Sequence, residues 1–136
     1  MVRIRLRKVG SKHQVSFRLV ATDRESPRDG RFLELLGQYN PRTEPGTIEL
    51  DEARVLHWLS QGAQPSESVS RLLKQTGTLE RFARLRQGEA LETLVSEAKA
   101  AQAARVVSPK TRRVAKPRGQ SKSKKPRKAQ PAAEAA

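Results

Sequence analysis

The chain has 136 residues, a formal net charge of +14 and no cysteine. This length has room for one domain and an extension, and the lack of cysteine excludes disulfides and thiolate zinc sites. No stretch approaches the ~20 apolar residues of a membrane span, and the N-terminus lacks the apolar run of a secretory signal, so we expect a cytoplasmic protein.

The positive charge is concentrated near the C-terminus. Residues 1–88 are mildly basic and residues 89–104 are slightly acidic, whereas residues 105–131 hold 11 Lys and Arg and no acidic residue. An excess of this size attracts polyanions because binding releases their condensed counterions. We therefore expect a domain over 1–88, an extension helix over 89–105 and a basic tail over 106–136.

The first eight residues alternate apolar and basic side chains. Val2, Ile4 and Leu6 alternate with arginines at positions 3, 5 and 7, which predicts a strand with an apolar face and a cationic face. Successive arginines on the cationic face stand about 6.6 Å apart, comparable to the separation of neighbouring phosphates along a nucleic-acid strand. The alternative is an edge strand whose charges only discourage aggregation.

A second strand follows a turn signal at Gly10-Ser11 and pairs with the first in a hairpin. Arg18 lies on its non-core face, where it either joins the arginine row or pairs with an acidic neighbour across the hairpin. Val20 breaks the alternation, which indicates a central strand covered on both sides or contact with a later loop.

Residues 23–30 form a polar loop in which Arg28 and, just after it, Arg31 flank a tight turn. The two guanidiniums could clasp one phosphate, or they could pair within the chain with Asp29 or Glu34. These acids and Glu25 show no metal-ligand spacing, so we expect neither a metal site nor catalysis.

Residues 32–39 read as a third strand, with Leu33 and Leu35 on the face of Tyr39 and with Leu36 on the other. Gly37 marks a bulge or a close backbone approach. A loop containing Arg42 leads to a short strand over 47–50.

Four helical segments follow. Asp51 caps a helix that stops at Gly62, and Ser66 caps a second that ends at Gly77. Residues 79–85 have helical spacing with arginines on the other face, and a helix after Gly88 packs on the domain, on a partner, or forms only transiently. From 106 onward four prolines and many cations predict disorder in isolation.

In fold class the chain is expected to be α+β, with a small, mostly antiparallel sheet of about four strands packed against two helices, an extra C-terminal helix and a disordered basic tail.

Several motifs occur in order along the first two-thirds of the chain: Met1-Val2-Arg3-Ile4-Arg5-Leu6, Gly10-Ser11-Lys12-His13, Phe17-Arg18-Leu19-Val20, Ser26-Pro27-Arg28-Asp29-Gly30-Arg31-Phe32, Tyr39-Asn40-Pro41, Trp58-Leu59, Gly62-Ala63-Gln64-Pro65 and Leu72-Leu73. Through these motifs, residues 1 to about 85 resemble the bacterial small-subunit ribosomal protein number sixteen family. Val15 and Phe17 stand where the family usually has Pro and Tyr.

The resemblance implies a non-enzymatic constituent of the small ribosomal subunit that binds its RNA, touches neighbouring ribosomal proteins and supports assembly and translation. We expect no cofactor, membrane, small-molecule substrate or homo-oligomer. The alternative is a free-standing nucleic-acid-binding or RNA-remodelling protein. The candidate RNA-binding residues are Arg3, Arg5, Arg7, Lys8, Lys12, His13, Arg18, Arg28, Arg31, Arg42, Lys110, Arg112, Arg113, Lys124 and Lys125.

Overall fold

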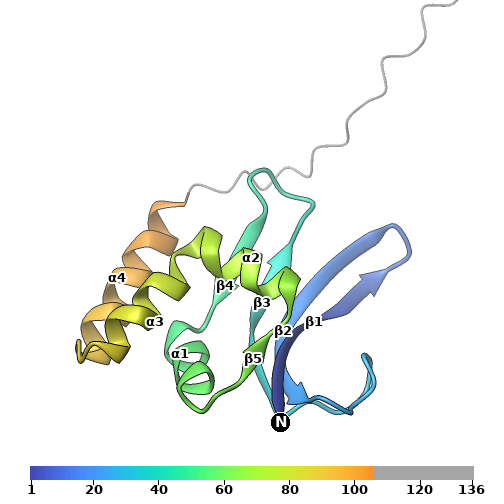
Figure 1. Ribbon diagram of the computed structural model, residues 1–136. Coiled ribbons are helices and arrows are strands. Elements are labelled where there is room, and N and C mark those ends of the chain that lie inside the picture. The colour runs from blue at the N-terminus through green and yellow to red at the C-terminus, as the bar shows by residue number, and fades with distance from the viewer. Residues whose placement is uncertain (106–136) are drawn as a thin grey trace, which may run out of the picture.

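A computed structural model describes residues 1–105 of the chain, and the predicted disorder of 106–136 falls outside this range. The element order is β1 (Val2–Ser11), β2 (Gln14–Asp23), β3 (Glu34–Asn40), β4 (Thr47–Leu50), α1 (Glu52–Ser60), β5 (Gln64–Pro65), α2 (Glu67–Thr76), α3 (Thr78–Arg86) and α4 (Leu91–Ala104). The α+β class is confirmed, and Figure 1 shows the helices gathered on one side of a curled sheet.

The described part of the sheet has five strands in the order β4-β3-β2-β1-β5. The strands from β1 to β4 pair antiparallel, as predicted, and β5 is an addition that pairs parallel with β1 at Arg3 and Ile4. β5 is only two residues long, too short to show a period of two, so alternation in the sequence could not reveal it.

The β1–β2 hairpin has a two-residue turn formed by Lys12 and His13. Gly10 and Ser11, expected in the turn, instead pair with Val15 and Gln14 and extend the strands. Gly10 has φ +99°, and a Cβ there would lie 2.2 Å from the Gln14 carbonyl oxygen. Glycine is therefore required for strand geometry at this position, rather than for the turn itself.

The inner face of the sheet carries the main core. Ile4 is fully buried, and Val2 and Leu6 are partly buried against the same cluster, which confirms the predicted apolar face of β1. Leu19 and Ala21 of β2 meet buried residues of α1 and α2, among them Val55 and Leu73. Asp51 caps α1 by accepting a hydrogen bond from the Arg54 backbone, as predicted, whereas the Ser66 side chain makes no capping bond to α2.

A bulge in β3 changes which residues reach the core. Leu19 pairs with Gly37 while the adjacent Val20 pairs with Leu35, so Leu36 is an extra residue in β3. Leu36 is fully buried, and Leu35 is 46% exposed. The prediction that Leu35 shares the face of Tyr39 was therefore wrong, because the extra residue shifts the alternation. Gly37 allows a close approach, since a Cβ there would lie 2.2 Å from the Glu49 carbonyl oxygen.

The loop between β2 and β3 lies along the outer face, the side of the sheet away from the helices. The Leu33 backbone donates to the Ala21 carbonyl over 2.8 Å, and the Thr22 hydroxyl donates to the Arg31 carbonyl over 3.3 Å. Val20 and Thr22 are each 1% exposed. β2 is therefore covered on both sides at this end, as the break in alternation at Val20 predicted.

A buried ion pair joins α1 to α3. The Arg81 guanidinium donates to the Glu52 carboxylate over 2.5 Å, and the Thr78 hydroxyl donates to its other oxygen over 3.1 Å. The two charged side chains are 9% and 7% exposed. Arg81 is one of the arginines predicted on the face of 79–85 opposite its apolar residues, and its guanidinium packs inward on Glu52.

α4 packs on the domain, the first of the three predicted alternatives. Leu94 is fully buried and Ala98 is 8% exposed. Arg84 of α3 binds both Glu89 and Glu97 over 2.9 Å, and Arg105 donates to the Gln75 carbonyl over 2.9 Å. None of the helices in residues 1–105 combines the length and apolar character needed to cross a membrane.

Candidate nucleic-acid interface

Four arginines lie on the outer face of the β1–β2 hairpin. Arg3, Arg5 and Arg7 alternate with the core residues of β1, and Arg18 is directly opposite Arg7 in the register. Residues directly opposite each other share a face of the sheet, so Arg18 lies in one row with the three arginines of β1. This arrangement is one of the two predicted alternatives. Like charges placed opposite one another across a strand pair are destabilising, which indicates that this pair serves a function other than stability.

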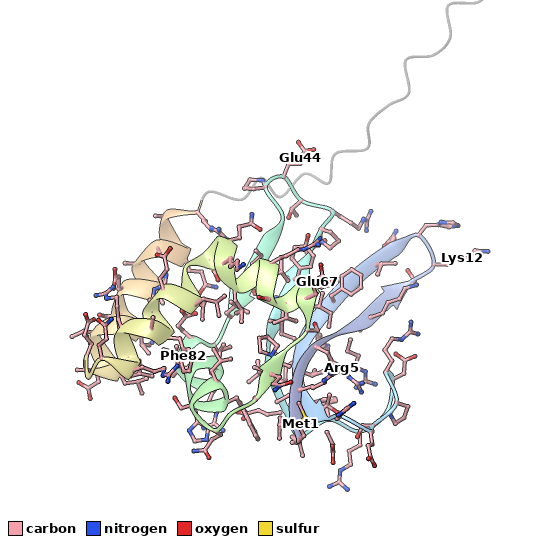
Figure 2. All side chains as sticks on the ribbon, viewed as in Figure 1. Met1, Arg5, Lys12, Glu44, Glu67 and Phe82 are labelled. Atoms are coloured by element: carbon pink, nitrogen blue, oxygen red, sulfur yellow. The ribbon has the colours of Figure 1, made fainter. Side chains whose placement is uncertain are left out.

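The row is not a set of equivalent free guanidiniums. Arg5 donates through one nitrogen to the carbonyls of Ser26 and Pro27, each over 2.7 Å, and its Nε is buried without a partner. Figure 2 shows the Arg5 side chain on the side of the sheet that faces the loop. The two hydrogen bonds from Arg5 therefore hold the β2–β3 loop in place.

Arg7 also contacts this loop, but less completely. Its guanidinium stacks over the Phe32 ring, 5.2 Å from the centroid, and makes a long 3.3 Å hydrogen bond to the Asp29 carbonyl. A cation over an aromatic face keeps its outward N–H groups available. Arg7 is thus fixed in orientation while it still presents donors outward.

Within the loop, Arg28 pairs with its neighbour Asp29 through two hydrogen bonds of 3.2 and 2.8 Å. The intramolecular alternative therefore holds for Arg28, although both side chains stay exposed. Arg28 lowers the pKa of the Asp29 carboxyl, mainly through this hydrogen bond, and the charges of Arg7 and Lys8 add to the effect. Arg31 is exposed and does not join this pair.

The other predicted partner, Glu34 at the start of β3, faces the helices instead. It accepts two hydrogen bonds from Arg54, over 2.6 and 2.7 Å, and one from the Trp58 indole over 2.7 Å. These contacts, with that of Arg54 the largest, lower the pKa of Glu34. Trp58 is partly buried against the core, and its indole also anchors this carboxylate.

An open concavity lies between the hairpin and the loop. It is lined by Arg7, Lys8, Val9, Gly10, Arg18, Arg28 and Asp29. Four cationic residues and one acidic residue therefore line a space open to solvent. Exposed guanidiniums that converge on such a space can bind phosphate oxygens through two parallel hydrogen bonds.

The remaining candidates lie elsewhere. Lys12 and His13 are exposed in the hairpin turn, and Figure 2 shows Lys12 projecting from its tip. Arg42 lies in the β3–β4 loop, where its backbone donates to the Asn40 side chain over 3.0 Å. The five candidates in the tail, Lys110, Arg112, Arg113, Lys124 and Lys125, lie outside the described residues. Among residues 1–105 there is no group of three or more side chains suited to hold a metal ion.

Replacing Arg5 by glutamine is expected to loosen the β2–β3 loop without unfolding the sheet. Hydrogen bonds from charged groups contribute about 1.5–3 kcal/mol each, and proteolysis of a loop follows its opening equilibrium. We expect cleavage by trypsin after Arg24, Arg28 or Arg31 to accelerate about tenfold or more. Arg3→Gln is the matched control, because Arg3 is exposed on the same face of β1. Equal cleavage rates in the two variants would contradict the role of Arg5.

The sequence of the chain is similar to a family model and to several known proteins. A family model described as ribosomal protein S16 matches residues 8–66. Small ribosomal subunit protein bS16 of Halothermothrix orenii is 54% identical over 81 residues, covering 60% of this chain and 92% of the relative. The bS16 proteins of Dictyoglomus thermophilum and Coprothermobacter proteolyticus are 52% identical over 82 residues and 55% over 78, covering 60% and 57% of this chain and 88% and 96% of the relatives.

Proposed function

Because the chain belongs to the ribosomal protein S16 family, we propose that it is a structural constituent of the small ribosomal subunit and binds ribosomal RNA through its outer-face arginines. The predicted family resemblance is confirmed by relatives that this chain covers almost completely. The relatives are named as small ribosomal subunit proteins. The proposed partners are the RNA of that subunit and its neighbouring proteins, and the proposed location is the ribosome in the cytoplasm.

The observation that carries the proposal is the Arg7–Arg18 pair beside the concavity. Arg7 and Arg18 are directly opposite each other in the register of the hairpin, and both line this space together with Lys8, Arg28 and Asp29. A phosphate group placed there would relieve the repulsion between the cations, because it would interact favourably with all of them. RNA backbone supplies such groups at regular spacing, and double-stranded RNA is recognised mostly by shape and backbone contacts.

The proposed mode of action is positioning by charge and shape, without chemistry on the RNA. Asp29, the acidic residue that lines the concavity, is engaged by Arg28, and Glu34 is engaged by Arg54 and Trp58. Arg5 keeps the loop preformed, so less conformational entropy is lost on binding. Contacts to phosphate and sugar fix register and orientation, which is what a structural component needs.

Sedimentation of ribosomal particles tests the proposal. Tagged protein expressed in cells that make ribosomes normally is expected to migrate with the small subunit at moderate salt and to leave it only at high salt, since phosphate contacts are salt-dependent. Protein that stays at the top of the gradient would overturn the proposal.

Truncation after Arg105 separates the proposal from a free-standing nucleic-acid-binding protein dominated by its tail. A chain ending at Arg105 keeps every outer-face arginine and the concavity, so we expect it still to enter the subunit. A free-standing binder would instead lose most of its affinity, because its cations are concentrated beyond that residue.

A further inference from the structure

An acidic residue, Asp29, lies among the cations of the concavity on the outer face. It lines this space together with Arg7, Lys8, Arg18 and Arg28. Both oxygens of its carboxylate accept from Arg28, since Nε donates to Oδ1 over 3.2 Å and Nη2 donates to Oδ2 over 2.8 Å. The carboxylate therefore occupies one edge of a guanidinium that lines the concavity.

A phosphate group binds a guanidinium in the same way, through two parallel N–H···O bonds. Asp29 and a phosphate therefore compete for the same two N–H groups of Arg28. The Arg28 and Asp29 side chains are 65% and 60% exposed, so RNA can reach both of them. An ion pair this exposed is weak, and a phosphate that contacts further cations at the same time can displace the carboxylate.

The surroundings keep Asp29 charged and in place beside these cations. The pKa of its carboxyl is lowered mainly by the hydrogen bond from Arg28, and the charges of Arg28, Arg7 and Lys8 add to the effect. The carboxylate is therefore ionised at neutral pH. The Asp29 backbone carbonyl also accepts a 3.3 Å hydrogen bond from Arg7, so the position of residue 29 does not depend on its side chain alone.

We propose that Asp29 is an internal competitor for the RNA phosphate and that this competition raises the specificity of the interface. The inference rests on the proposed function. A phosphate that meets Arg28 alone has to replace an existing ion pair and gains little free energy. A phosphate that fits the concavity contacts Arg7, Lys8 and Arg18 as well, and these contacts offset the loss of the pair. RNA whose backbone does not fit is thus bound less tightly, which is discrimination against wrong partners.

The variant Asp29→Asn tests this competition. Asparagine suits a turn and keeps the backbone carbonyl that Arg7 binds, but it removes the charge. Glu25→Gln is the matched control, because Glu25 is an exposed acid of the same β2–β3 loop and the change in net charge is the same. Filter binding of the full-length protein to a small-subunit RNA fragment and to an unrelated RNA of equal length measures both affinities.

For the unrelated RNA, we expect Asp29→Asn to raise the affinity about two- to fivefold more than Glu25→Gln does, which is the range for loss of an exposed ion pair. For the small-subunit fragment, we expect a smaller gain, because the phosphate that fits the concavity already displaces the carboxylate. The preference of the protein for the small-subunit fragment therefore falls in Asp29→Asn and is unchanged in Glu25→Gln.

The salt dependence of binding to the unrelated RNA provides a second measurement. Without the carboxylate, Arg28 can neutralise one more phosphate, so the slope of log affinity against log salt is expected to steepen by about 0.7–0.9. The double variant Asp29→Asn with Arg28→Gln is expected to show no such steepening, because the released cation is absent. Glu25→Gln is expected to keep the slope of the unaltered protein.

Two results would overturn the inference. Weaker binding of both RNAs by Asp29→Asn would show that the carboxylate orients Arg28 toward RNA instead of competing with it. Equal gains for the two RNAs, or equal effects of Asp29→Asn and Glu25→Gln, would show that only the net charge matters. If the unaltered protein has no preference for the small-subunit fragment, the proposed function fails together with the inference. If it has that preference and Asp29→Asn retains it, only the inference fails.

Discussion

Replacing Glu52 by alanine is expected to lower the free energy of unfolding by about 3–5 kcal/mol, the usual effect of removing one partner from a buried ion pair. The Arg81 guanidinium would remain 9% exposed with its main counter-charge removed, and the Thr78 hydroxyl would lose its acceptor. A domain of this size is typically stable by only about 5–15 kcal/mol. Urea denaturation followed by far-UV circular dichroism measures the effect.

Glu67→Ala is the control for this prediction, because its ion pair with Arg71 is exposed on one helix and such pairs contribute at most about 0.5 kcal/mol. The double variant Glu52→Leu with Arg81→Met is expected to be more stable than Glu52→Ala, because it leaves no buried charge without a partner. Similar midpoints for Glu52→Ala and Glu67→Ala would show that the buried pair contributes little.

Replacing Arg7 and Arg18 together by glutamine is expected to weaken binding to ribosomal RNA at every salt concentration. Removing one cation that binds a phosphate lowers the slope of log affinity against log salt by about 1, so the double replacement lowers it by about 2. Filter binding of the protein to a small-subunit RNA fragment across a salt series measures both quantities. Arg71→Gln combined with Lys74→Gln on α2 has the same change of charge and is expected to have a smaller effect.

Arg18→Gln alone separates function from folding. It removes the like-charged neighbour of Arg7, so stability is expected to stay the same or rise while RNA binding weakens. Loss of stability together with loss of binding would indicate a structural role for Arg18 and would contradict its assignment to the interface.

Much of the fold follows from local patterns in the sequence. The alternation of Val2, Ile4 and Leu6 with arginines was sufficient to predict both faces of β1, because one face of the sheet is buried along the core and register is then strongly specified. Gly37 could be predicted as a bulge or a close approach because it lacks a side chain to pack within a strand. The structure shows both.

The tertiary partners of the charged side chains could not be predicted in this way. In the sequence pattern, Arg5 is one of three equivalent arginines. In the structure, its guanidinium donates hydrogen bonds to backbone carbonyls more than twenty residues away. Likewise, Glu52 and Arg81 are 29 residues apart, on separate helices. Leu36 is buried because β3 contains one extra residue. A regular alternation of apolar and polar residues does not show where such an extra residue lies.

The turn at Lys12 and His13 also determines which side chains face outward on the second strand. With two residues in the turn, position 18 meets position 7 on the outer face. One inserted residue would slip the pairing by one and carry Arg18 toward the core while Leu19 turned to solvent. The length of this turn therefore specifies the cationic surface as firmly as the identity of its arginines does.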